Sequence, residues 1–224
     1  NGGWIQEFRE ESDQNRWIVG IPQGDFLETG SSNKAMFTYL PKRNIANTYT
    51  ITSPCFDFSQ ARRPMIKMNL WRIFSDADGA VLQYTVDNGR NWRVVGSLDD
   101  GINWYNSTSL IGSSPGDQSF GWTSDGSPDE NWVTAKHKLD IPELMNSSMV
   151  RFRIAYGALD NQLLSRKGLA VDSIWIGERE KKILAELEDR GSHRIPRKKP
   201  QPGGKIGTPP ARGIYDWNDP AALQ

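Results

Sequence analysis

The chain has 224 residues, of which 27 are Lys or Arg and 27 are Asp or Glu, so its formal net charge is zero. This balance argues against a nucleic acid or an anionic membrane surface as the partner, because both are bound through an excess of positive charge. Nine Trp and 21 Gly residues, without any apolar run near the roughly 20 residues that span a bilayer, favour an aromatic-rich β domain with no membrane insertion.

Short stretches in which apolar and polar residues alternate recur along most of the chain. Such stretches are typical of half-buried strands, and their spacing predicts an antiparallel two-sheet sandwich. In one of them, Phe152 and Ile154 are expected to face the core while Arg151 and Arg153 face away from it. The expected strands are KAMFTYL (34–40), TYTITSPCFDF (48–58), PMIKMNLWRIF (64–74), AVLQYTV (80–86), NWRVVG (91–96), NWVTAKHKL (131–139), MVRFRIAYG (149–157) and LAVDSIWIG (169–177).

A turn with a recognisable pattern joins two of these strands. Asp87, Asn88 and Gly89 are residue types that tolerate the positive φ angles of tight hairpin turns. The segment TVDNGRNW fits the Asp-box pattern Ser-x-Asp-x-Gly-x-x-Trp, with Thr in place of Ser. In that pattern the Asp caps the turn and the Trp folds over it, so Asp87, Gly89 and Trp92 are predicted to build a structural turn rather than a catalytic one.

Residues that often carry chemistry occur singly in this chain. Cys55 is the only cysteine, so a disulfide within the chain is impossible and the thiol is expected to be a small buried apolar group. His137 lies inside an expected strand and is predicted to face solvent in a structural role. The DADG run at 76–79 resembles half a calcium loop, but no EF-hand Glu follows, so a solvated turn is expected.

Motifs of catalytic sites are not evident. The sequence shows no Gly-x-Ser-x-Gly elbow, phosphate loop, Cys/His pair or zinc-binding cluster. The chain is therefore predicted not to be an enzyme, with no catalytic residues. A carboxylate pair for glycoside hydrolysis stays open at this stage, because such pairs have no fixed spacing in sequence.

The stretch 99–131 is rich in Gly, Ser, Asp and Trp and is predicted to be a long surface loop. Its aromatic residues, interleaved with polar ones, are of the types that stack on sugars or anchor protein interfaces. The same residues could instead cover the end of the sandwich, and the sequence leaves these three roles open. The candidate ligand- or partner-binding residues are Trp104, Tyr105, Trp122 and Asp125.

The pattern changes after the last expected strand, so a β domain over 1–177 is predicted to be followed by two further segments. Good helix formers with an apolar stripe predict a short helix over 178–191. The remainder, 192–224, is rich in Pro, Gly, Lys and Arg and is expected to be an extended arm that docks on a partner. Residues 191–224 hold six Lys or Arg against two Asp, whereas the rest of the chain holds 21 basic against 25 acidic residues. The predicted anchors of the arm are Ile214, Tyr215 and Trp217.

A broader resemblance covers roughly residues 15–178. The segments SSNKAMFTYL, TSPCFDFS, RRPMIKMNLW, DGAVLQYTVDNGRNW, NWVTAKHKLD, VRFRIAYG and GLAVDSIWIGE resemble, in this order, a MAM-like jelly-roll domain of Bacteroidetes cell-surface proteins associated with gliding and type IX secretion. The sandwich with an Asp box is also similar to a reelin subrepeat. The resemblance implies a two-sheet antiparallel jelly roll on an extracellular, outer-membrane-associated protein, without catalysis.

The same resemblance implies a structural calcium ion. Asp172 matches the Asp that recurs in the last strand of such domains, and Asp25 and Asp57 are further candidates, since calcium needs six to eight oxygen ligands. The alternative is that Asp172 accepts hydrogen bonds from nearby loop backbone and needs no metal.

The sequence therefore predicts a non-catalytic extracellular adhesion or assembly module whose arm docks on a protein partner. The alternative is a carbohydrate-binding module that uses the Trp residues of the long loop to bind a glycan.

Overall fold

The structure is a computed structural model in which residues 3–7, 16–21, 34–39, 47–73, 78–110, 114–124, 132–158 and 168–179 are described. The chain divides into two units, Asn1–Gly177 and Glu178–Gln224. Only the first two residues of the second unit are described, so the expected helix, the expected arm and the anchors Ile214, Tyr215 and Trp217 lie outside the described residues. Glu178, the first residue of the expected helix, is instead the last residue of a strand.

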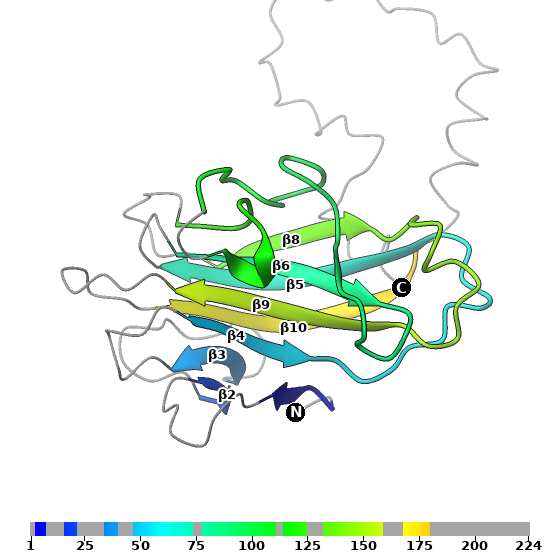
Figure 1. The fold of residues 1–224 in the computed structure, drawn as a ribbon, viewed down its shortest axis with the longest axis horizontal. Coiled ribbons are helices and arrows are strands. Elements are labelled where there is room, and N and C mark those ends of the chain that lie inside the picture. Colours follow the sequence, from blue (N-terminus) through cyan, green and yellow to red (C-terminus); the bar gives the residue numbers. More distant parts are fainter. Residues whose placement is uncertain are drawn as a thin grey trace, which may run out of the picture. The chain divides into compact units, whose positions relative to one another are not determined.

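The first unit is a sandwich of two five-stranded antiparallel sheets (Figure 1). Sheet A contains, in spatial order, β1 (Ile5–Glu7), β4 (Asn47–Thr52), β9 (Arg151–Ala158), β6 (Gly79–Thr85) and β7 (Arg93–Val94). Sheet B contains β2 (Arg16–Gly20), β3 (Ala35–Tyr39), β10 (Gly168–Glu178), β5 (Pro64–Ile73) and β8 (Val133–Lys138). In each sheet a strand from late in the chain, β9 or β10, lies between two strands from earlier in it. The all-β jelly roll predicted from the sequence is thereby confirmed; β1 and β2 had no expected counterpart.

The main core lies between the two sheets and follows the alternation seen in the sequence. In β9 the side chains of Phe152 and Ile154 are fully buried, while Arg151 and Arg153 are only partly buried on the other face. Residues of β4, β5 and β6 complete the same cluster, and β6 is buried at every position. The period-two pattern predicted correctly which face of β9 is buried.

A second apolar cluster lies on the opposite face of sheet B. Phe37 of β3 and Ala170 of β10 are register partners, and both are buried together with Trp71 and Ala35. Consequently β3 is buried on both faces and does not show the simple alternation of a half-exposed strand.

The long segment between β7 and β8 closes one side of the sandwich. Trp122 exchanges two backbone hydrogen bonds with Ala80 of β6, at 2.8 and 2.9 Å, and Ile102 forms a bridge with Lys136 of β8. The same segment carries the 3₁₀ turn η1 (Pro115–Asp117), which packs on β6 and β9 (Figure 1). A stretch predicted to be a surface loop is thus attached to one strand of each sheet, β6 of sheet A and β8 of sheet B.

Candidate functional site

The aromatic residues predicted to bind a ligand are buried in the core. Trp104 is 3% exposed, and Tyr105 and Trp122 are 0% exposed. The ring centroid of Trp122 lies 4.8 Å from that of Trp104 and 4.7 Å from that of Tyr105, in edge-to-face arrangements. A ring without exposed surface cannot stack on a sugar, so the binding role predicted for these three residues is wrong and the packing alternative is correct. Asp125 lies outside the described residues.

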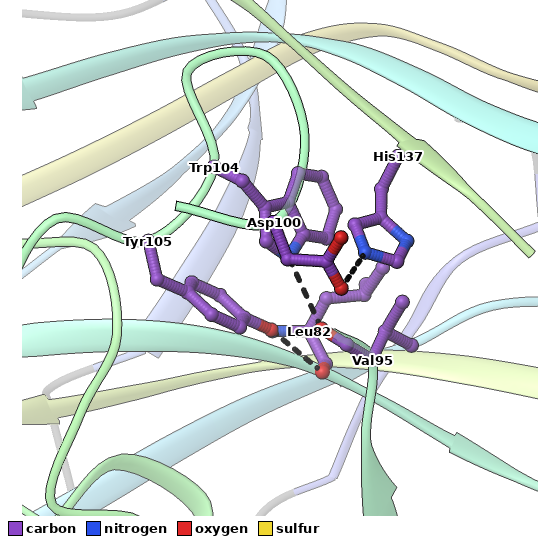
Figure 2. Close-up of polar contacts among 6 residues, drawn as sticks. All are labelled: Leu82, Val95, Asp100, Trp104, Tyr105 and His137. Atoms are coloured by element: carbon purple, nitrogen blue, oxygen red, sulfur yellow. Dashed lines mark hydrogen bonds and ion pairs between the residues drawn. The ribbon is translucent and has the colours of Figure 1, made fainter. Parts of the chain in front are cut away.

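Backbone acceptors explain why these rings can be buried. Trp104 donates from Nε1 to the carbonyl oxygen of Val95 at 3.1 Å, and Trp122 donates from Nε1 to that of Asn103 at 3.0 Å. The Tyr105 hydroxyl donates to the Leu82 carbonyl at 3.1 Å and accepts from the Leu82 N–H at 3.0 Å (Figure 2). Burial raises the pKa of Tyr105 far above its ordinary value. These hydrogen bonds satisfy the polar atoms of aromatic rings that are buried in the core.

His137 belongs to the same cluster and does not face solvent as predicted. Figure 2 shows its imidazole beside the Trp104 indole and the Asp100 carboxylate, with Nε2 3.0 Å from Asp100 Oδ2. The His137 side chain is 8% exposed, whereas that of Asp100 is 58% exposed. Gly96 and Gly101 lie directly against the imidazole, and the absence of side chains there lets the loop fold over the ring. The pair holds the loop over the buried imidazole.

The loop between β6 and β7 is held by its own side chains. Asp87 Oδ1 accepts from Thr85 Oγ1 at 2.7 Å and from the Asn91 N–H at 2.9 Å, and Oδ2 accepts from Asn91 Nδ2 at 2.6 Å. These bonds, with the one from Thr85 largest, lower the pKa of Asp87 to about 2. Gly89 has a φ of 90° and lies against the Trp92 ring. These contacts of the Asp87 carboxylate are made within the loop and stabilise the turn.

Two further expectations from the sequence are wrong. Cys55 is exposed, because Phe56 and Phe58 on either side of Asp57 pack on Phe152 and Cys55 is left on the outer side of the segment. Asp78, expected in a solvated turn, is fully buried and its Oδ2 accepts from the Tyr156 hydroxyl at 3.3 Å.

Two of the three candidate calcium ligands lie within the described residues. Asp57 Oδ1 accepts from the Ser59 N–H and Asp172 Oδ1 from the Ser173 N–H, at 2.8 and 2.7 Å. No group of three metal-ligating side chains forms within the described residues, and Asp25 lies outside them. Calcium binding therefore stays a prediction.

The outer face of sheet A presents two arginines from its central strand. β9 lies between β4 and β6, and Arg151 and Arg153 point outward because Phe152 between them points into the core. The register places Thr52 of β4 and Gln83 of β6 on either side of Arg153. We call the surface made by these residues the Arg face; its members are Arg151, Arg153, Thr50, Thr52 and Gln83.

Arg153 is fixed by its neighbours on this face. Its Nε donates to Gln83 Oε1 at 2.7 Å, and its guanidinium carbon lies 4.4 Å from the centroid of the Trp92 ring. Gln83 in turn donates from Nε2 to the carbonyl of Gly116 in η1 at 2.8 Å. The segment that closes the sandwich therefore also orders one end of the Arg face.

Arg151 differs because its donors are largely unused. Nη1 lies 3.5 Å from the Ser53 carbonyl oxygen, a long contact for a hydrogen bond. Its Nε is buried without a partner, and so is the hydroxyl of Thr52 on the neighbouring strand. Within the part of the chain that the structure describes, Arg151 has no carboxylate partner. Buried polar atoms of this kind call for an explanation, and this face is the candidate functional site.

The sequence alone predicted part of the Arg face. The alternation of β9 already placed Arg151 and Arg153 on one outer face. The neighbours Thr52 and Gln83 come from segments about 100 and 70 residues earlier in the chain, and only strand pairing brings them to the arginines.

Comparisons with known proteins give similarity to solved structures only. No family model matches the chain, and no curated protein matches it. It is similar to the CBM22-1 xylan-binding domain of Xyn10C from Paenibacillus barcinonensis, with 10% identity, a TM-score of 0.41, and coverage of 78% of this chain and 84% of that chain. It is also similar to the K1 cleaved adhesin domain of Lys-gingipain from Porphyromonas gingivalis W83, with 9% identity, a TM-score of 0.43, and coverage of 79% and 91%.

A third similar structure is TmCBM61 in complex with β-1,4-galactotriose, with 10% identity, a TM-score of 0.39, and coverage of 79% of this chain and 91% of that chain. Similarity at this level leaves the function of this chain to be inferred from its own residues. In the described ranges, no helix is long and apolar enough to cross a membrane.

Proposed function

We propose that this chain is a non-catalytic binding module that holds a polysaccharide on the Arg face. The observation that carries the proposal is Arg151, a partly exposed arginine on the outer face of β9 that has no carboxylate partner among the described residues. A guanidinium offers five N–H donors in a fixed plane, and among the described residues it makes one long contact, from Nη1 to the Ser53 carbonyl oxygen. Arg153, two residues along the same strand, adds a second partly exposed positive charge to this face.

The proposal keeps the carbohydrate-binding alternative from the sequence but moves its site. The expected site used Trp104 and Trp122, whose rings are closed inside the core. The Arg face instead presents two partly exposed arginines, Arg151 and Arg153, on the outer side of sheet A. Binding there needs no nucleophile or proton-transfer group, which is why the proposed module is non-catalytic.

Affinity electrophoresis tests this proposal. The full chain is run through gels containing a panel of neutral and acidic polysaccharides, and at least one polymer is expected to retard it. Arg151→Gln should abolish most of the retardation, whereas Lys67→Gln, which removes a positive charge from the outer face of sheet B, should not. The number of reducing ends of the retained polymer should stay constant over time, because a non-catalytic module does not cleave the polymer. A chain that no polymer retards would contradict the proposal.

Docking of the C-terminal arm on a protein partner is the second candidate function. The observation that favours it is the charge contrast between the segment 191–224, with six basic and two acidic residues, and the rest of the chain, with 21 basic and 25 acidic residues. Deleting 178–224 should abolish co-purification with a partner while leaving polysaccharide binding intact. Unchanged co-purification would contradict arm docking.

The proposed location is extracellular, at the surface of an outer membrane, as the resemblance to cell-surface jelly rolls implies. Fractionation of the source cells should find the protein accessible to added protease on intact cells. Protection until the cells are lysed would contradict this location.

A further inference from the structure

We propose that the ligand of the Arg face is an acidic polysaccharide, in which Arg151 binds a sugar carboxylate. This inference rests on the proposed function and names the chemical class of its ligand. The planar guanidinium matches the two oxygens of a carboxylate, and such charge-assisted bonds are stronger than those to neutral hydroxyl groups. A second positive charge, Arg153, lies two residues along the same strand and on the same face.

The two arginines have different roles in this proposal. Arg153 is already held by Gln83 and the Trp92 ring, so it contributes a fixed positive charge with little freedom to lose on binding. Arg151 makes one long contact, to the Ser53 carbonyl oxygen, and has no carboxylate partner among the described residues. Arg151 is therefore the residue that contacts the carboxylate, and Arg153 raises the local positive potential beside it.

The positive charge is local to this face. Outside the basic tail at 191–224, the chain carries 21 basic against 25 acidic residues, so a general attraction for polyanions is not expected from the body of the domain. Binding of an anion at the Arg face therefore depends on direct contact with the arginine pair. This dependence makes a single substitution a sharp test.

An acidic peptide is the competing ligand, and the position of β9 argues against it. Peptides that bind to sheets commonly add to an edge strand through backbone hydrogen bonds. β9 is the central strand of sheet A, and both of its edges are paired with β4 and β6. The Arg face therefore offers side chains to a ligand, and no unpaired backbone edge of β9.

Nucleic acid is disfavoured by the state of Trp92, the aromatic residue that lies against Arg153. Single strands are held by stacking of bases on open aromatic rings. The Arg153 guanidinium lies over the Trp92 ring, and the ring also lies against Gly89. These contacts occupy the ring, so it does not offer an open face on which a base could stack.

The test uses the full chain and three probes in isothermal titration calorimetry. The probes are polygalacturonate, the same polymer with its carboxylates methyl-esterified, and polyglutamate. We expect binding to polygalacturonate, little binding to the ester, and weaker binding to polyglutamate. Raising the NaCl concentration from about 20 to about 200 mM should weaken the binding to polygalacturonate, because salt screens exposed charges.

Variants identify the residue that makes the contact. Arg151→Gln should weaken binding to polygalacturonate about tenfold, the effect of one lost charge-assisted hydrogen bond. Arg151→Lys keeps the positive charge but loses the planar guanidinium, so it should weaken binding less than Arg151→Gln does. It replaces Arg151→Gln as the test if that variant does not fold. Lys67→Gln, on the outer face of the other sheet, should bind as the wild type does.

Each contrary result has a separate meaning. Equal binding to the acid and the ester, weakened in both by Arg151→Gln, overturns the acidic ligand and retains the polysaccharide-binding function. Tighter binding to polyglutamate overturns the inference in favour of an acidic peptide. Acid-specific binding that neither Arg151 variant changes overturns the assignment to this face. Failure of every polysaccharide, neutral or acidic, overturns the proposed function itself.

Discussion

The imidazole of His137 stacks on the indole of Trp104, with ring centroids 4.7 Å apart and an interplanar angle of 33°. His137 comes from β8 in sheet B, and Trp104 from the segment that also reaches β6 in sheet A. The contact therefore ties that segment to both sheets, and Asp100 closes it from the solvent side. Several consequences for stability can be measured.

Gly96→Ala should destabilise the fold. Gly96 has a φ of 73°, and a Cβ at this position would lie 2.4 Å from His137 Nε2 and 2.8 Å from Trp104 Nε1. The expected loss in the free energy of unfolding is at least about 1 kcal/mol, measured by urea titration with Trp fluorescence. Gly20→Ala is the matched control, because a Cβ there meets nothing within 4 Å. Equal stability of the two variants would contradict the observed packing.

Tyr105→Phe should be destabilising although only one oxygen atom is removed. The Tyr105 hydroxyl satisfies both the N–H and the carbonyl of Leu82 in the buried strand β6. Removing it leaves buried backbone groups without this partner, at a cost of about 1–3 kcal/mol. Urea titration measures the loss, and a variant as stable as the wild type would show that the two bonds do not contribute.

Tyr105 should also make the fold sensitive to alkali. Burial raises its folded pKa above the ordinary value of 10.0, so its contribution to stability is present below pH 10 and is lost as the pH rises above it. The ultraviolet absorbance of the folded protein should show tyrosines that ionise only on unfolding, and their number should be lower by one in Tyr105→Phe. Ionisation of all tyrosines near pH 10 in the folded state would contradict the prediction.

Asp87→Asn should change the response to acid. The folded pKa of Asp87 is about 2, below the ordinary 3.8, so its charged form stabilises the fold above about pH 4, and this stabilisation is lost as the pH falls from about 4 to 2. The variant should be less stable at pH 7 and should lose less stability over that acid range. Thermal unfolding at a series of pH values measures both effects. Asp99→Asn, at an exposed loop position, should follow the wild-type curve.

Trp122→Phe should reduce stability without a separate effect on ligand binding. The Trp122 ring is fully buried against Trp104 and Tyr105 and donates to the Asn103 carbonyl. Loss of ring volume and of this bond should cost about 1–3 kcal/mol. Polygalacturonate titration of the folded variant should give the wild-type affinity. Normal stability with lost binding would restore the role first predicted for this residue.

The sequence predicted the strands well because the alternation of side chains along a strand is a local property. Phe152 must face away from Arg151 whenever that segment is extended, whatever the rest of the chain does. The eight expected strands therefore correspond to β3 to β10, and the buried face of β9 was correctly predicted. The same reasoning placed both arginines of the Arg face on one side of β9.

Burial of residues in the connecting segments followed a different rule. The roles expected for Trp104, Cys55 and His137 were wrong because each depends on residues far away in the sequence. Trp104 and His137 are 33 residues apart and are buried by contact with each other, while Cys55 is turned outward because its neighbours pack on Phe152. An aromatic residue in a polar segment has the same local pattern whether it covers a core or a ligand.

The alternating residues by themselves therefore determined that this chain forms an antiparallel sandwich and which side of each main strand faces its core. Only the tertiary structure decided that the Trp-rich segment closes that core and that Arg151 and Thr52 share an outer face with unused polar atoms. The physical reason is that side-chain alternation arises within a strand, whereas burial and the supply of hydrogen-bond partners depend on pairing between strands that are distant in the sequence.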